Sequence, residues 1–199
     1  MTLREFREQL QMLMDVPGLR PFVCDGSPLA ARVFVVGFNP ATSMDEPFWR
    51  YWSDDAGFDR QQFMSDYLSK RRLRKPKGVR ARVERIVSQL PRGAALETNI
   101  CSLPSRTAAE LNRQQRTTRI FRFLLETISP TIVYAHSDEP IRYFEALTGR
   151  RGFDSGIPVE ADHAGRRFHL LATRGPLFRM GYDDAEALGG RLGALLGAA

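Results

Sequence analysis

Four short polar segments of the chain could hold or transform a small ligand, and each of them follows a short apolar run. They are GFNPAT at 37–42, NICSLPS at 99–105, HSDEP at 136–140 and TRGPLF at 173–178. In the first segment, the Asn39 side chain offers one carbonyl acceptor and two N–H donors. Pro40 favours an extended Asn39, and Gly37 permits a sharp turn or the close approach of a ligand. Asn39 is therefore expected either to contact a ligand or only to cap the turn.

The other reactive side chains form no metal-binding or catalytic pattern. Cys24 and Cys101 stand far apart and cannot complete a zinc or iron–sulfur site, so both are interpreted as buried apolar residues. His136 could face a ligand or be structural, His163 is interpreted as a surface residue, and His169 as a structural one. The sequence also lacks a Walker loop and a GxGxxG fingerprint. We therefore expect no metal, no iron–sulfur cluster and no cofactor.

The almost wholly apolar run at 32–37 is typical of a strand buried on both faces. Further strands are expected at 95–101, 131–135 and 167–173. Helices are expected at 2–14, 79–89, 107–128, 140–147 and 183–196, and the aromatic-rich stretch 44–68 is expected to form a loop and a short helix. This alternation predicts an α/β fold, a three-layer α/β/α sandwich around a mainly parallel four-stranded sheet. Ligands of such sheets bind beyond the carboxyl ends of the strands, so the four segments should meet at one edge.

Length and composition favour one globular domain. The 199 residues are 43% hydrophobic, which suits a single domain over 1–199, with 1–30 as an N-terminal helix and lead-in. The sequence contains no transmembrane-length apolar run and no signal-peptide pattern. A cytoplasmic protein with no membrane partner is therefore expected.

The charge of the chain is basic and unevenly distributed. It has 29 Lys and Arg against 23 Asp and Glu, a formal net charge of +6. Basic residues gather in two stretches, at 70–85 and 106–122. Each stretch could be a solvated helix face, or an electrostatic footprint for a nucleic-acid backbone.

Three of the polar segments, in their order along the chain, resemble the motifs of the uracil-DNA glycosylase superfamily. VFVVGFNPAT is similar to the first motif of its mismatch-specific and single-strand-selective branch, which begins Gly-x-Asn-Pro. ETNICSLPS is similar to the second strand, where an Asn reads the pyrimidine, and TRGPLF stands where the family carries a His-Pro-Ser-type loop. The resemblance covers roughly residues 30–197.

The resemblance implies a role for each matching residue of the base pocket. Asn39 would position the attacking water, with Asp45 assisting it, and Asn99 would pair with the pyrimidine edge. The residues expected to shape the substrate pocket are Gly37, Phe38, Pro40 and Thr173. An aromatic side chain would stack on the extruded base; Phe48 and Trp49 are the alternatives, and either could instead belong to the core.

The resemblance also implies a DNA-binding loop. Leu177 would fill the gap left by the extruded base, or would only cover the edge of the core, and Arg174 would hold a phosphate. The remaining DNA-binding candidates are Gly175, Pro176, Lys75 and Lys77. Thr173 replaces the family's His, and Gly175 replaces its serine. Losing one such donor typically costs about 2.7–4 kcal/mol of transition-state stabilisation, which implies a slower or differently specific enzyme.

These features predict a DNA glycosylase for base-excision repair. It would act as a monomer on damaged or mismatched, single- or double-stranded DNA, hydrolysing the N-glycosidic bond of uracil or a similar deaminated or damaged base after base flipping. Two alternatives remain open. One is a catalytically weak or inactive nucleic-acid-binding module of the same fold, and the other is an enzyme acting on free nucleosides or nucleotides.

Overall fold

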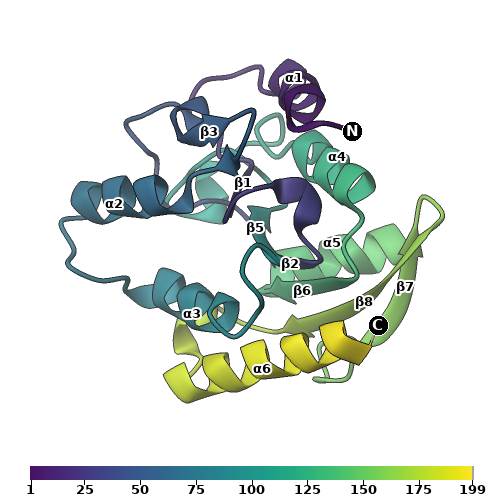
Figure 1. The fold of residues 1–199 in the computed structure, drawn as a ribbon. Helices are drawn as coiled ribbons and strands as arrows, with labels where there is room; N and C mark the ends of the chain where they lie inside the picture. The colour runs from purple at the N-terminus through teal and green to yellow at the C-terminus, as the bar shows by residue number, and fades with distance from the viewer. Residues whose placement is uncertain (199) are drawn as a thin grey trace.

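A six-stranded sheet forms the centre of the computed structural model, which describes residues 1–198 (Figure 1). The strand order is β1-β5-β2-β6-β8-β7. Its strands are β1 (Phe22–Cys24), β2 (Val33–Gly37), β5 (Ala95–Asn99), β6 (Ile132–His136), β7 (Val159–His163) and β8 (Arg166–Thr173). The inner strands β5, β2, β6 and β8 are parallel, and β1 and β7 pair antiparallel at the two edges. The mainly parallel α/β sheet is thus confirmed, and the four expected strands are its inner ones.

The count of four strands was wrong because both edge strands have weak sequence patterns. β1 is only three residues long and follows a Pro- and Gly-containing stretch. In β7 only Ala161 is buried, so the strand shows no apolar run. An additional two-stranded hairpin, β3 (Trp52–Ser53) and β4 (Gly57–Phe58), lies outside the main sheet.

Side-chain alternation along β2 divides the apolar residues between two cores. Val33 and Val35 face one core, whereas Phe34 and Val36 face the other. All of β2 is buried, as expected for an inner strand covered on both faces. The strand that precedes the GFNPAT loop is therefore held from both sides.

Helices cover both of these cores. They are α1 (Leu3–Leu13), α2 (Arg60–Lys70), α3 (Gly78–Val87), α4 (Arg119–Ile128), α5 (Asp138–Thr148) and α6 (Tyr182–Ala198). Helices α3 and α6 pack on the face of Val33 and Val35, and α1, α4 and α5 contribute to the core on the other face. Figure 1 shows α3 and α6 below the sheet and α1 and α4 above it. A side chain at Gly189 would collide with the Ile86 carbonyl, 2.5 Å away, so this glycine allows α3 and α6 to approach closely.

The helix expected at 107–128 is wrong in its first half. The structure has a short 3-10 helix at Ala108–Glu110 and then a loop, and α4 begins only at Arg119. The stretch NRQQRTT at 112–118 has no apolar residue to bury, and Asn112 and Gln115 instead exchange two side-chain-to-backbone hydrogen bonds of 3.0 Å each. This local turn competes with helix formation.

The lead-in before residue 30 contributes more than the expected helix. It supplies α1, the edge strand β1 and the 3-10 helix Pro28–Ala30. None of the helices within residues 1–198 is both long and apolar enough to span a bilayer.

Candidate functional site

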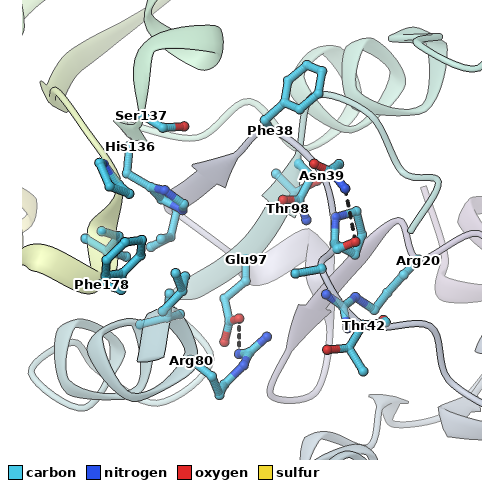
Figure 2. A pocket seen from close by; sticks show the side chains of 18 of the residues that line it. Arg20, Phe38, Asn39, Thr42, Arg80, Glu97, Thr98, His136, Ser137 and Phe178 are labelled. Atoms are coloured by element: carbon cyan, nitrogen blue, oxygen red, sulfur yellow. Dashed lines mark hydrogen bonds and ion pairs between the residues drawn. The ribbon is translucent and has the colours of Figure 1, made fainter. Parts of the chain in front are cut away.

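A cavity of about 330 Å³ opens where β5, β2 and β6 end at their carboxyl edge (Figure 2). Its wall is built from segments far apart in the sequence. They are Arg20, the loop 38–42, Tyr67, the first turn of α3, the end of β5, His136 and Ser137, and the segment 176–178. This is the edge at which the sequence predicted that the four polar segments would meet, and each of them contributes to the wall.

The GFNPAT loop is fixed by backbone hydrogen bonds to the segment after β5. The amides of Ile100 and Cys101 donate to the carbonyls of Gly37 and Phe38, at 2.9 and 2.8 Å. The amide of Ser105 donates to the carbonyl of Pro40, at 2.9 Å. The first two polar segments therefore form one rigid unit, which holds Phe38, Asn39 and Pro40 in the cavity wall.

The Asn39 amide has a defined orientation. Its Nδ2 donates to the carbonyl oxygen and the Oγ of Ser105, at 2.8 and 2.9 Å, and to the Pro40 carbonyl at 3.2 Å. The side-chain oxygen Oδ1 has no such partner among residues 1–198, which leaves a carbonyl acceptor for a ligand or water. Ser105 was not identified from the sequence, because nothing in SLPSRT distinguishes this serine from Ser102.

Gly37 makes room for two side chains from the neighbouring strands. A Cβ at residue 37 would lie 2.7 Å from Asn99 Oδ1 and 3.0 Å from His136 Cε1. Gly37 stands opposite Asn99 in the β2–β5 register, and its φ is not positive. The glycine is thus required by space and not by backbone conformation, and it lets Asn99 and His136 approach each other at the cavity wall.

The His136 imidazole is uncharged at neutral pH. Burial lowers its pKa to about 4, against a smaller opposing effect of the Glu97 carboxylate. A neutral imidazole has one N–H donor and one acceptor. In the β6–β8 register His136 stands opposite Thr173, the first residue of the TRGPLF segment.

Thr173 is engaged within the protein. Its Oγ1 accepts a hydrogen bond of 3.1 Å from the Tyr134 hydroxyl, and burial raises the pKa of Tyr134 to about 12. Thr173 is not among the residues of the cavity wall. Of these two neighbouring residues at the ends of β6 and β8, His136 lines the cavity and Thr173 does not.

Two members of a largely buried ion-pair network, Glu97 and Arg80, line the cavity (Figure 2). Glu97, in the middle of β5, pairs with Arg80 of α3 and with Arg60, whose Nη2 lies 3.0 Å from Glu97 Oε1. Arg60 also pairs with Glu84 at 2.8 Å. Burial opposes ionisation of Glu97, but Arg80 and Arg60 outweigh it and hold its pKa below the ordinary range. An acidic residue within an otherwise buried strand is a sequence signal for such a network, because a buried carboxylate needs charged partners.

Besides Thr173, other expected site residues lie outside the cavity wall, among them Asp45, Phe48 and Trp49. Asp45 is exposed and pairs with Lys70, so its carboxylate has a different partner. Phe48 is 6% exposed and packs edge-on against Phe22, with ring centroids 5.1 Å apart. Trp49 packs against Phe48, with centroids 5.0 Å apart. Phe48 and Trp49 thus belong to the core or pack against it. The aromatic side chains of the cavity wall are instead Phe38, Tyr67 and Phe178.

The TRGPLF loop turns one apolar side chain inward and one outward. Leu177 and Phe178 both line the cavity, but Leu177 is 2% exposed and packs in the core with α3 and α6, whereas Phe178 is 51% exposed. Pro176 also lines the cavity, and Gly175 has a φ of 75°. Arg174 pairs with Asp154. Leu177 thus covers the edge of the core, which leaves Phe178 as the residue available at the rim.

A basic and aromatic surface continues from the cavity along α3. Tyr182 is 43% exposed and lies under the guanidinium groups of Arg82 and Arg85, at 4.2 and 4.5 Å from its ring centroid. Lys75 and Lys77 are exposed in the connection that leads into α3. These groups combine positive charge with an exposed aromatic ring, a combination found in nucleic-acid-binding surfaces.

No protein-family model matches this chain, and no curated protein matches it. Among residues 1–198, the structure shows no group of three or more His, Cys, Asp or Glu side chains arranged to hold a metal ion.

Proposed function

We propose that the protein is a DNA glycosylase that hydrolyses the N-glycosidic bond of a deaminated or damaged base such as uracil. The observation that carries this proposal is the Asn39 side chain at the cavity wall. Both of its N–H donors are bound to Ser105 and Pro40, so the amide is held in one orientation while Oδ1 remains available. In glycosidic hydrolysis the oxocarbenium-like sugar reacts readily with a water molecule that is correctly oriented. A fixed hydrogen-bond acceptor such as Asn39 Oδ1 can hold that water in place.

The two side chains over Gly37 complete the proposed chemistry. Asn99 reads the pyrimidine edge through its amide, and Asn39 Oδ1 holds the water that attacks C1′ of the sugar. As the C1′–N bond breaks, the base leaves as an anion, and the neutral His136 donates a hydrogen bond to its developing charge. The oxygen of the water bonds to C1′, and the proton that the water loses passes through solvent to the departing base. His136 thereby takes the role that Thr173 cannot perform. A preorganised donor of this kind typically contributes about 2.7–4 kcal/mol.

The surface beside the cavity supports DNA as the partner. Phe178 fills the gap left by the flipped nucleotide, and the face formed by Lys75, Lys77 and the Tyr182 cluster follows the phosphate backbone. We further propose that the enzyme is monomeric and cytoplasmic. We also propose that its fold is a three-layer α/β/α sandwich.

An excision assay tests the proposal. Labelled single-stranded and mismatched duplex DNA containing uracil, hypoxanthine or xanthine is incubated with the wild-type protein and with Asn39→Ala. Excision is expected to fall by at least about 100-fold in Asn39→Ala, the effect of losing one preorganised polar group. Asn112→Ala, which removes an asparagine side chain outside the cavity, is the matched control and should keep wild-type excision. Equal excision by all three proteins would remove Asn39 from the mechanism.

One observation favours a second function, a binding module that does not cut DNA. Thr173 does not line the cavity, so the TRGPLF loop does not offer a ligand the donor that family members use. Salt-sensitive DNA binding without excision of any of the three bases would establish this second function in place of the first.

A further inference from the structure

Arg20 places a cation in the cavity wall without a carboxylate partner. It lies in the segment before β1 and lines the cavity (Figure 2). Tyr67 is close enough to affect its pKa. Its Nη1 donates to the Thr42 carbonyl at 3.3 Å, and its guanidinium lies 5.7 Å from the centroid of the Phe63 ring. Arg20 takes part in none of the ion pairs formed within residues 1–198. Most of its five donors are therefore free for a ligand.

The charges around Arg20 do not balance. The network beside it contains Arg60 and Arg80 against Glu84 and Glu97, so these four residues are neutral together and Arg20 adds an uncompensated positive charge. Burial and the nearby Arg80 lower the pKa of Arg20 to about 10, and the guanidinium stays protonated at neutral pH. A desolvated cation without a counter-ion is costly, and a ligand anion would remove that cost.

We propose that the Arg20 end of the cavity binds a phosphate group of a nucleotide ligand whose base lies toward Asn99 and His136. This rests on the proposed function in that it takes the ligand to be a nucleotide, whose own anionic group is phosphate. Arg20 matches phosphate through its planar fork of donors, and Arg80 adds positive charge beside it. The volume of about 330 Å³ lies in the range of small-molecule sites, roughly 300–1,000 Å³, and gives room for more than a base.

Such a phosphate could come from two sources with the same chemistry. It is either an internucleotide phosphate next to a flipped nucleotide of DNA, or the terminal phosphate of a free nucleotide. Two pairs of probes separate the sources. The first pair is deoxyuridine and its 5′-monophosphate. The second is a trinucleotide with a central deoxyuridine, made with ordinary linkages or with uncharged methylphosphonate linkages.

Binding is measured by calorimetry for the wild-type protein, Arg20→Gln and Arg20→Lys, with Arg166→Gln as the matched control. Arg166 is exposed at the start of β8, the end of the strand opposite to the cavity. The wild-type protein and the control should bind the charged member of at least one pair about tenfold or more tightly than its uncharged counterpart. Arg20→Gln should lose this preference while keeping its affinity for the uncharged probe, and Arg20→Lys should keep part of it, because lysine retains the charge without the fork.

The pair that shows the preference identifies the source of the phosphate. Equal affinity for the charged and uncharged members of both pairs in the wild-type protein would overturn the proposal, and so would a preference that survives in Arg20→Gln. If Arg20→Gln fails to fold, as judged by circular dichroism, the wild-type comparison and Arg20→Lys still decide. These readouts need no bond cleavage, so failure of the excision assay with a retained Arg20-dependent preference would reject the glycosylase and leave the phosphate site in place.

Discussion

The loops after β2 and after β8 begin from the same position in the fold but use their residues differently. Both follow an inner parallel strand, and both contain a glycine and a proline. The loop after β2 is bound along its length to the segment after β5, and it keeps a polar amide at the cavity wall. The loop after β8 inserts Leu177 into the core and leaves Phe178 at the rim. Position in the sheet thus places a loop at the cavity, while packing decides which side chain faces the ligand.

The sharpest test of this comparison is a pair of truncations at neighbouring residues. Leu177→Ala should lower the free energy of unfolding by about 2–5 kcal/mol, because it removes a fully buried side chain. Phe178→Ala should change it by less than about 0.5 kcal/mol, because the ring is exposed, yet it should weaken binding of duplex DNA about tenfold. Urea denaturation and DNA titration of both variants measure the two effects. A stability loss at Phe178 equal to that at Leu177 would contradict the assignment of the two side chains.

The glycines of the two loops should respond differently to an added methyl group. Gly37→Ala should cost about 1–3 kcal/mol of folding stability through overpacking, since its Cβ would meet Asn99 and His136. Gly175→Ala meets open space but has a φ of 75°, and its cost is the strain of a left-handed alanine, about 1–2 kcal/mol. The discriminating measurement is ligand affinity. Gly37→Ala should displace Asn99 and weaken binding of deoxyuridine, and Gly175→Ala should not.

The sequence predicted the parts of the molecule that depend on local pattern. The inner strand β2 is a continuous apolar run, and the carboxyl ends of β2 and β5 place Asn39, Pro40 and Asn99 at the cavity. The catalytic roles of these residues stay predictions. Phe48 and Trp49 were the alternatives for the stacking role that the resemblance implies, but these aromatic rings pack against each other and against Phe22.

The charged part of the cavity could not be predicted, because it is assembled from distant segments. Arg80 and Glu97 pair across two elements, and Arg20 joins them from the segment before β1. No spacing rule links these positions. Glu97 alone carried a signal, since a charge in a buried strand needs partners, but the sequence does not say which of the many arginines would supply them.

The pH dependence of folding tests the environment of His136. Its pKa in the folded protein, about 4, lies below the ordinary value of 6.5, so the unfolded chain binds the proton more readily. The contribution of the uncharged His136 to the free energy of unfolding should therefore be fully present above pH 6.5. It should be lost as the pH drops from 6.5 toward 4. His136→Gln should reduce this loss of stability by about 1–2 kcal/mol, as measured by denaturation at pH 7.5 and 5. The magnitude follows from about 1.4 kcal/mol for each unit of pKa difference, lowered because the ring is partly exposed. His169→Gln, outside the cavity wall, should retain the wild-type dependence.

The smallest expected effect concerns the hydroxyl that orients Asn39. Ser105→Ala removes the 2.9 Å hydrogen bond to Nδ2 but keeps the one to the Ser105 carbonyl. The transition state should lose about 0.5–1.5 kcal/mol of stabilisation. The excision rate should therefore decrease roughly three- to tenfold, with little change in the affinity for deoxyuridine.

Ser102→Ala is the matched control for this change. The Ser102 hydroxyl is buried without a hydrogen-bond partner in the part of the chain that the structure describes, so its removal should leave the rate unchanged and should not destabilise the fold. If the two variants had equal excision rates, the orientation of Asn39 would depend on backbone contacts alone. The rigid unit formed by the loops after β2 and β5 would then be sufficient for positioning, and the contrast with the loop after β8 would lie in the backbone hydrogen bonds and not in Ser105.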